Sequence, residues 1–146
     1  MINEFITYSP AETYNKANKF STSLSAGDIV ALSGDLGCGK TLFTQGIAAG
    51  LGVKDIVNSP TFKLIGEYDS IPPLYHFDFY RLNSPSEALA LGLEYYFQAG
   101  GIVVVEWADL FPQIIPTDAI WVKIEIRGEY QRNISIGIKE FETFSD

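Results

Sequence analysis

Residues 34–41 have the types and the spacing of a loop that binds phosphate groups. They read Gly34-Asp35-Leu36-Gly37-Cys38-Gly39-Lys40-Thr41 and fit the pattern G-x-x-x-x-G-K-[ST]. Glycines let consecutive backbone N–H groups turn inward around an anion and form a concave nest. In this pattern the lysine, here Lys40, reaches the outer phosphates of a nucleotide, and the hydroxyl of Thr41 is a ligand of Mg²⁺.

The segments on either side of this loop predict a buried strand before it and a helix after it. The run Asp28 to Ser33 is short and apolar, and the turn Ala26-Gly27 precedes it. Behind the loop, apolar residues recur at helical spacing as far as two glycines that are a plausible stop. A helix at this position directs its positive N-terminal end toward a bound phosphate.

Two carboxylates are candidates for holding the Mg²⁺ of such a site. Glu106 follows the β-branched run 102–105, which is typical of a buried central strand. Asp78 lies in a second strand-like segment, where alternation puts it on one face with His76 and Tyr80. Both stay candidates, because P-loop enzymes use a carboxylate at the end of a buried strand. A polar strand end and a solvated strand face are the respective alternatives.

Three further side chains could take part in chemistry. His76 is the only histidine and Cys38 the only cysteine, so no zinc site of usual composition is expected. For His76 a structural hydrogen bond is favoured over proton transfer. For Cys38 a small side chain that fills the loop is favoured over a redox-sensitive site. Trp107 follows Glu106 directly and either stacks on a base or a partner side chain or packs in the core.

ATP is the expected nucleotide. A guanine-specific N-K-x-D motif should lie far downstream of the loop, whereas the one similar string, residues 15–18, lies before it and ends in Asn18. A polar turn, Ser59-Pro60-Thr61-Phe62, follows the loop helix at the place where a nucleotide-sensing switch segment with a Mg²⁺-contacting Thr61 would fall.

The composition excludes several classes of protein. A chain of 146 residues with 47% hydrophobic residues is most simply one domain, residues 1–146, with a packed core. The net charge of −8 argues against a free-standing nucleic-acid binder, because phosphate backbones require clustered Lys and Arg. Any RNA would therefore be reached through a partner. No signal peptide and no membrane-spanning stretch is recognised, so the chain is expected in the cytoplasm.

The order of strand-like and helix-like segments predicts the fold class. We expect an α/β fold of the P-loop NTPase type, with a mainly parallel central sheet, antiparallel additions and helices on both faces. The expected strands are 2–8, 28–33, 62–69, 74–80, 102–105, 120–126 and 132–138, and the expected helices are 10–24, 42–51 and one that starts at 85. Ser9 and Ser84 are the expected N-caps, each followed by proline.

Taken together, four segments resemble the bacterial TsaE family, also called YjeE. They are residues 34–41, 59–62, 76–82 (His-Phe-Asp-Phe-Tyr-Arg-Leu) and 105–107 (Val-Glu-Trp), and they agree with the family in order, spacing and total chain length. The resemblance covers roughly residues 5 to 130. It implies a small P-loop ATPase needed to make the threonylcarbamoyl modification of adenosine beside the anticodon of tRNAs that read codons starting with A.

The resemblance also implies partners and residue roles. Such a protein acts on a complex of TsaB and TsaD, of which TsaD is the transferase, and ATP hydrolysis is thought to reset that complex. Thr41 and Glu106 would be the Mg²⁺ ligands, and Asp78 the acidic group needed for hydrolysis. Thr61 would belong to the switch, and Trp107 would lie beside the nucleotide or the partner. The expected nucleotide-binding residues are Gly34, Leu36, Gly37, Cys38, Gly39, Lys40, Thr41, Leu42, Ser9 and Thr13. Of these, Ser9 and Thr13 would lie near the adenine.

The sequence departs from the family at a few positions. Many members carry Ala where Cys38 stands and a second Thr where Leu42 stands, and neither change removes a required donor. No family motif matches the residues after Leu110. Slow hydrolysis by the chain alone is expected, because no arginine finger is evident and Arg81, the nearest candidate, could equally be structural.

Two other functions remain open from the sequence. A small P-loop kinase would need an Arg-rich lid, and the presence of only three scattered arginines argues against one. A nucleotide-sensing interaction module would use binding rather than hydrolysis as its signal.

Overall fold

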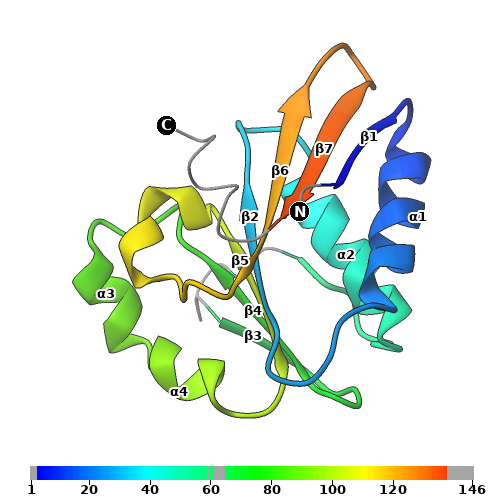
Figure 1. Cartoon of the computed structure of the whole chain (residues 1–146). Helices are drawn as coiled ribbons and strands as arrows, with labels where there is room; N and C mark the ends of the chain where they lie inside the picture. The colour runs from blue at the N-terminus through cyan, green and yellow to red at the C-terminus, as the bar shows by residue number, and fades with distance from the viewer. Residues whose placement is uncertain (1–2, 59, 61–64, 138–146) are drawn as a thin grey trace.

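Seven strands form a single sheet in the computed structural model, which describes residues 3–58, 60 and 65–137 (Figure 1). The strands lie in the order β1-β7-β6-β2-β5-β4-β3. Their bounds are β1 Asn3–Thr7, β2 Ile29–Ser33, β3 Ile65–Tyr68, β4 Leu74–Asp78, β5 Ile102–Glu106, β6 Ile120–Ile126 and β7 Arg132–Gly137. The predicted switch residue Thr61 lies outside the described residues.

The middle of the sheet is parallel and its edges are antiparallel. Strands β6, β2, β5 and β4 run parallel to one another. Strands β7 and β1 add antiparallel pairs at one edge, and β3 forms the predicted hairpin with β4 at the other. Every residue of β2 and β5 is buried, as expected of apolar strands that are covered on both faces. The predicted fold class is confirmed.

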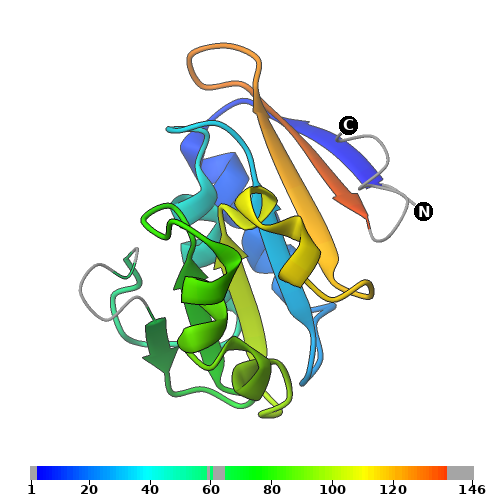
Figure 2. The same ribbon diagram turned by 90° about the vertical axis from the view of Figure 1, so that its left-hand side faces the viewer.

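Helices cover both faces of the sheet (Figure 2). Helices α1 (Pro10–Ser21) and α2 (Lys40–Gly50) pack together on one face. The other face is covered by α3 (Pro85–Ala90), α4 (Leu93–Phe97) and the short 3₁₀ helices η1 (Ala108–Leu110) and η2 (Pro112–Ile114). Each face therefore has its own apolar core, centred on Phe43 and Ile47 on one side and on Phe77 and Phe79 on the other.

The helix ends depart from the prediction for local reasons. Ser9 and Ser84 cap their helices as predicted, each accepting a hydrogen bond from the backbone N–H of the glutamate three residues later. Helix α1 ends at Ser21 rather than near residue 24, because the backbone N–H groups of residues 22–24 bond to carbonyls three residues back instead of four. The helix predicted to start at residue 85 does so as α3, and it is separated from α4 by Gly92, whose φ of +86° is left-handed.

None of the helices in the described part of the chain is long and apolar enough to cross a membrane.

Candidate functional site

The glycine-rich loop lies between β2 and α2, at the carboxyl end of the parallel strands. Gly34 has a φ of +147°, and a Cβ there would lie 2.4 Å from the carbonyl oxygen of Ile124 on β6. Gly39 is the N-cap of α2, with a φ of +112°. Only glycine adopts such backbone angles without strain, so these positions fix the path of the loop onto the helix N-terminus.

Lys40 turns its side chain back over this loop. Its Nζ donates hydrogen bonds to the carbonyl oxygens of Gly34 (2.5 Å) and Asp35 (3.0 Å). The same ammonium lies 3.8 Å from the centre of the Trp107 ring, which is a cation–π contact. Lys40 is buried, so its ammonium group is held inside the loop and is largely shielded from solvent.

Trp107 has a strained backbone next to the carboxylate Glu106. Its φ is +58°, the single positive φ among the described non-glycine residues, and such a conformation costs about 1 kcal/mol or more. Its half-buried ring contacts Lys40 and is tilted against Tyr80, with ring centres 4.8 Å apart. This bend turns the indole over Lys40 and the loop, so the strained backbone places an aromatic ring beside the pocket.

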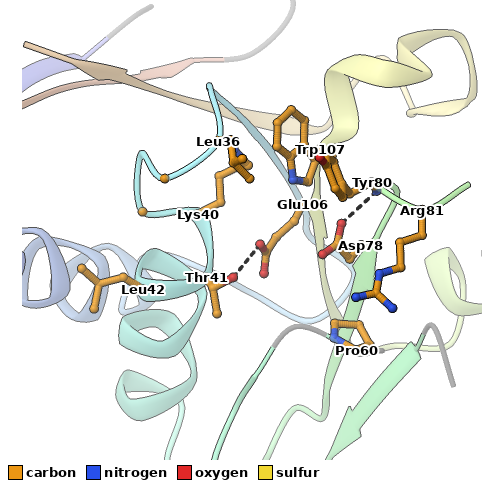
Figure 3. A pocket seen from close by; sticks show the side chains of 12 residues that line it. Leu36, Lys40, Thr41, Leu42, Pro60, Asp78, Tyr80, Arg81, Glu106 and Trp107 are labelled. Carbon is orange, nitrogen blue, oxygen red and sulfur yellow. Dashed lines mark hydrogen bonds between the residues drawn. The ribbon is translucent and has the colours of Figure 1, made fainter. Parts of the chain in front are cut away.

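Glu106 is held at the beginning of α2. Its Oε1 accepts a hydrogen bond from the hydroxyl of Thr41 at 2.8 Å (Figure 3). Its Oε2 lies 2.5 Å from Nε2 of His76, within hydrogen-bond distance, and 3.4 Å from the hydroxyl of Thr44. The pairing of β5 beside β2 produces this contact, since Glu106 is in register with Leu32 near the end of the P-loop strand.

Asp78 lies beside Glu106 at the same edge of the sheet. The two residues are in register across the parallel strands β4 and β5. Asp78 is half-buried, and its Oδ1 accepts a hydrogen bond from the backbone N–H of Tyr80 at 2.9 Å. Both sequence-predicted carboxylates therefore reach one place, but Glu106 bonds Thr41 whereas Asp78 lies further toward solvent.

A pocket of about 380 Å³ joins the loop to these carboxylates (Figure 3). It is lined by Leu36, Gly37, Gly39, Lys40, Thr41, Leu42, Pro60, Asp78, Tyr80, Arg81, Glu106 and Trp107. Its volume is in the range of small-molecule sites. The hydroxyl of Thr41 and the two carboxylates are hard oxygen donors, which is the set that Mg²⁺ prefers when it also keeps water and phosphate ligands.

A second, smaller pocket of about 160 Å³ opens on the other side of the loop. It is lined by Pro10, Thr13, Gly37, Cys38, Gly39, Leu42, Tyr130 and Arg132. The structure brings Thr13 to the loop, although its hydroxyl is engaged with that of Thr7 at 2.7 Å. Ser9 lines neither of these two pockets, because its hydroxyl caps α1.

Arg132 is a residue of the site that the sequence did not single out. Its Nε donates to the carbonyl oxygen of Cys38 at 2.9 Å, and its Nη2 lies 3.5 Å from the carbonyl oxygen of Gly37. Its Nη1 donates to the carbonyl oxygens of Gly128 and Gln131, each at 3.0 Å, in the β6–β7 turn. One guanidinium therefore ties the turn to the loop. No sequence signal marks it, because the contact spans 94 positions.

Cys38 fills the interior of the loop. It is 1% exposed, and its Sγ lies 3.5 Å from Nζ of Lys40. Burial raises the pKa of the thiol, and the opposing charge of Lys40 does not reverse the shift. A buried thiol with a raised pKa is a poor nucleophile, which agrees with the expected filling role.

This strand–loop–helix unit, with Lys40 and Thr41 facing a carboxylate on the neighbouring parallel strand, defines a P-loop protein of the α/β class. A family model described as "Threonylcarbamoyl adenosine biosynthesis protein TsaE" matches residues 7–134. The chain belongs to the TsaE family, and the resemblance found in the sequence is confirmed.

Individual relatives agree with this assignment. The chain is 45% identical to the tRNA threonylcarbamoyladenosine biosynthesis protein TsaE of Bacillus subtilis over 130 residues, which cover 88% of this chain and 81% of that protein. It is 37% identical to the protein of the same name from Rickettsia bellii, over 90% of this chain and 92% of that one. The crystal structure of Bacillus subtilis YdiB superposes with a TM-score of 0.81 at 35% identity, covering 99% of this chain and 92% of that chain.

Proposed function

We propose that this chain binds and hydrolyses Mg²⁺–ATP as a subunit of the machinery that makes threonylcarbamoyladenosine in tRNA. The names of the relatives support the pathway. One observation carries the ATPase part of the proposal: Lys40, Thr41 and Glu106 meet in one pocket at the ends of two parallel strands. That is the arrangement in which P-loop proteins hold phosphates and their metal.

The loop and Lys40 would bind the phosphates of the nucleotide. The backbone N–H groups of the loop and the positive end of α2 favour an anion, and the Lys40 ammonium adds a full charge. We place the adenine in the pocket beside Thr13, because this pocket shares Gly37, Gly39 and Leu42 with the larger pocket, which we assign to the phosphates and call the phosphate pocket. Nucleotide would therefore lie across the loop, with the phosphates toward Glu106.

Thr41 and Glu106 would hold Mg²⁺, which neutralises phosphate charge when it is bound. The 2.8 Å bond between Thr41 and Glu106 already places two hard donors side by side. Asp78 lies next to Glu106 and nearer to solvent, so its carboxylate is placed to orient a water or accept its proton. Asp78 is the residue that we assign to hydrolysis rather than to binding.

The site by itself supplies little charge for the transition state. Arg81 is the one arginine that lines the phosphate pocket in the described part of the chain, and it is exposed. A partner that contributes an arginine in trans would complete such a site. We propose the TsaB–TsaD complex as that partner, with tRNA reached only through it, and a cytoplasmic location for the assembly. The net charge of −8 favours docking to protein over direct docking to tRNA.

The test is ATP hydrolysis by the purified chain, alone and with TsaB and TsaD at equal concentrations. We expect slow phosphate release alone and stimulation by the two partners together. If ATP binds but phosphate release stays at background with both partners present, the proposed ATPase function is wrong and a nucleotide-sensing module is favoured. Transfer of the phosphate to a metabolite instead of water would identify a kinase.

A further inference from the structure

His76 is completely buried under the phosphate pocket and contacts the carboxylate of Glu106. It lies on β4, is 0% exposed and is not among the residues that line the pocket. Its Nε2 lies 2.5 Å from Oε2 of Glu106. Its other ring nitrogen, Nδ1, has no hydrogen-bond partner among the described residues. The ring therefore makes one polar contact, and that contact is with a predicted Mg²⁺ ligand.

The two oxygens of Glu106 have different partners. Oε1 accepts from the hydroxyl of Thr41 at 2.8 Å. Near Oε2 there is also the hydroxyl of Thr44, but this hydroxyl has a closer acceptor, the carbonyl oxygen of Lys40 at 2.9 Å against 3.4 Å. A hydroxyl has one proton to donate, so His76 is the main donor to Oε2. Removing that donor would leave Oε2 of a residue that is 2% exposed with only the long contact to the Thr44 hydroxyl.

We propose that His76 is a positioning residue. By donating its Nε2–H to Oε2, it keeps Oε1 of Glu106 turned toward Thr41, so that Oε1 and the hydroxyl oxygen of Thr41 together receive Mg²⁺. This inference rests on the proposed Mg²⁺ role of Glu106 and Thr41. Hydrogen-bond partners behind a metal ligand fix its orientation, and their loss typically lowers metal affinity about 10- to 100-fold. Because His76 does not reach the pocket, it acts on the metal only through Glu106.

Two variants with the same functional group separate positioning from packing. In His76→Gln the terminal amide reaches about as far as Nε2 of the ring, so it can still donate to Glu106. In His76→Asn the amide ends near the position of Nδ1 and falls short. Affinity for a fluorescent ADP analogue is measured for each variant with excess Mg²⁺ and with excess chelator, and Glu106→Gln serves as the reference for loss of the ligand.

We expect the gain in nucleotide affinity on adding Mg²⁺ to fall about tenfold in His76→Asn and to stay within about threefold of wild type in His76→Gln. The affinity in chelator should change little in either variant. Suppose that Mg²⁺ raises nucleotide affinity in His76→Asn as much as in wild type, but raises it less in Glu106→Gln. That result would overturn the positioning role of His76 and leave the proposed metal site intact. No gain in wild type, or an unchanged gain in Glu106→Gln, would instead overturn the proposed metal site and the positioning role with it.

A measurement on the wild-type chain keeps the proposal testable if His76→Asn does not fold. The chain has one histidine, so the imidazole nitrogens of the tag-free protein give a single pair of NMR signals. We expect Nε2 to carry the proton, hydrogen-bonded to carboxylate, both without and with Mg²⁺ and ADP. A bare Nε2, or loss of this hydrogen bond when Mg²⁺ and ADP bind, would contradict positioning by His76.

Discussion

The glycine-rich loop is held from two sides that differ in what they contribute. On the parallel side, β5 and β4 end in the carboxylates Glu106 and Asp78, which face the phosphate pocket. On the antiparallel side, β7 contributes Arg132, whose guanidinium binds carbonyl oxygens of the loop. One side supplies the carboxylates that we propose for chemistry, and the other side holds the backbone of the loop in place.

This difference follows from the direction of the strands. Parallel strands bring their carboxyl ends to the same edge of the sheet, so residues that follow several strands meet there. In the antiparallel pair β6–β7 a tight turn lies at that edge instead, and the side chain just after it, Arg132, extends sideways to the loop. Variants on the two sides should therefore change different quantities.

The largest effect on nucleotide binding is expected from Lys40→Ala. This variant removes the buried ammonium group that would pair with the phosphates. ATP affinity should fall by about 100-fold or more, as it does when one partner of a desolvated charge pair is lost. Titration with a fluorescent ATP analogue measures the change, and circular dichroism checks that the fold is kept. Affinity within a few-fold of wild type would exclude Lys40 as the main phosphate contact.

Asp78→Asn should affect hydrolysis alone. The amide oxygen can still accept the hydrogen bond from the Tyr80 N–H, so local structure is kept. Loss of a group that positions or deprotonates water should lower the partner-stimulated turnover by about 100-fold, with ATP affinity within about threefold of wild type. Asp78→Ala, which also removes the acceptor, is the comparison. An equal fall in affinity in both would give Asp78 a binding role.

Arg132→Met should act on stability more than on chemistry. It removes the charge-assisted hydrogen bonds that join the β6–β7 turn to the loop, and we expect about 2 kcal/mol less free energy of unfolding. ATP affinity should fall by less than about tenfold, because the phosphate contacts stay. Urea denaturation and the nucleotide titration measure the two effects. Unchanged stability together with a large loss of affinity would place Arg132 on the chemical side of the comparison.

The smallest effect is expected on the pH dependence of stability, through Cys38, which lies in the loop between the two sides. Because burial raises the pKa of the thiol above its ordinary value, the unfolded chain loses this proton at a lower pH than the folded chain. The contribution of the protonated thiol to stability is therefore complete below the unfolded pKa and is lost as pH rises through the folded pKa. Cys38→Ala should remove this part of the alkaline destabilisation, measured as melting temperature against pH. An unchanged alkaline slope would contradict it.

Much of the site could be predicted from the sequence because its signals are local. The loop pattern, the strand before it and the helix after it occupy one continuous segment, and the structure has them as β2, residues 34–39 and α2. The hairpin of β3 and β4 and the serine caps were local as well. For the helix that starts at residue 85 no end was predicted, because a glycine such as Gly92 does not reveal its φ in the sequence.

The sequence by itself determined the glycine-rich loop, the α/β class and the two candidate carboxylates, since each depends on residues close together in the chain. Only the tertiary structure decided that Glu106 accepts a hydrogen bond from Thr41, because β5 is the strand beside β2 on this side of the sheet. It also decided that His76 lies behind Glu106 and that Arg132 holds the loop. These contacts join segments 30 to 94 positions apart, and the order of strands in the sheet brings them together.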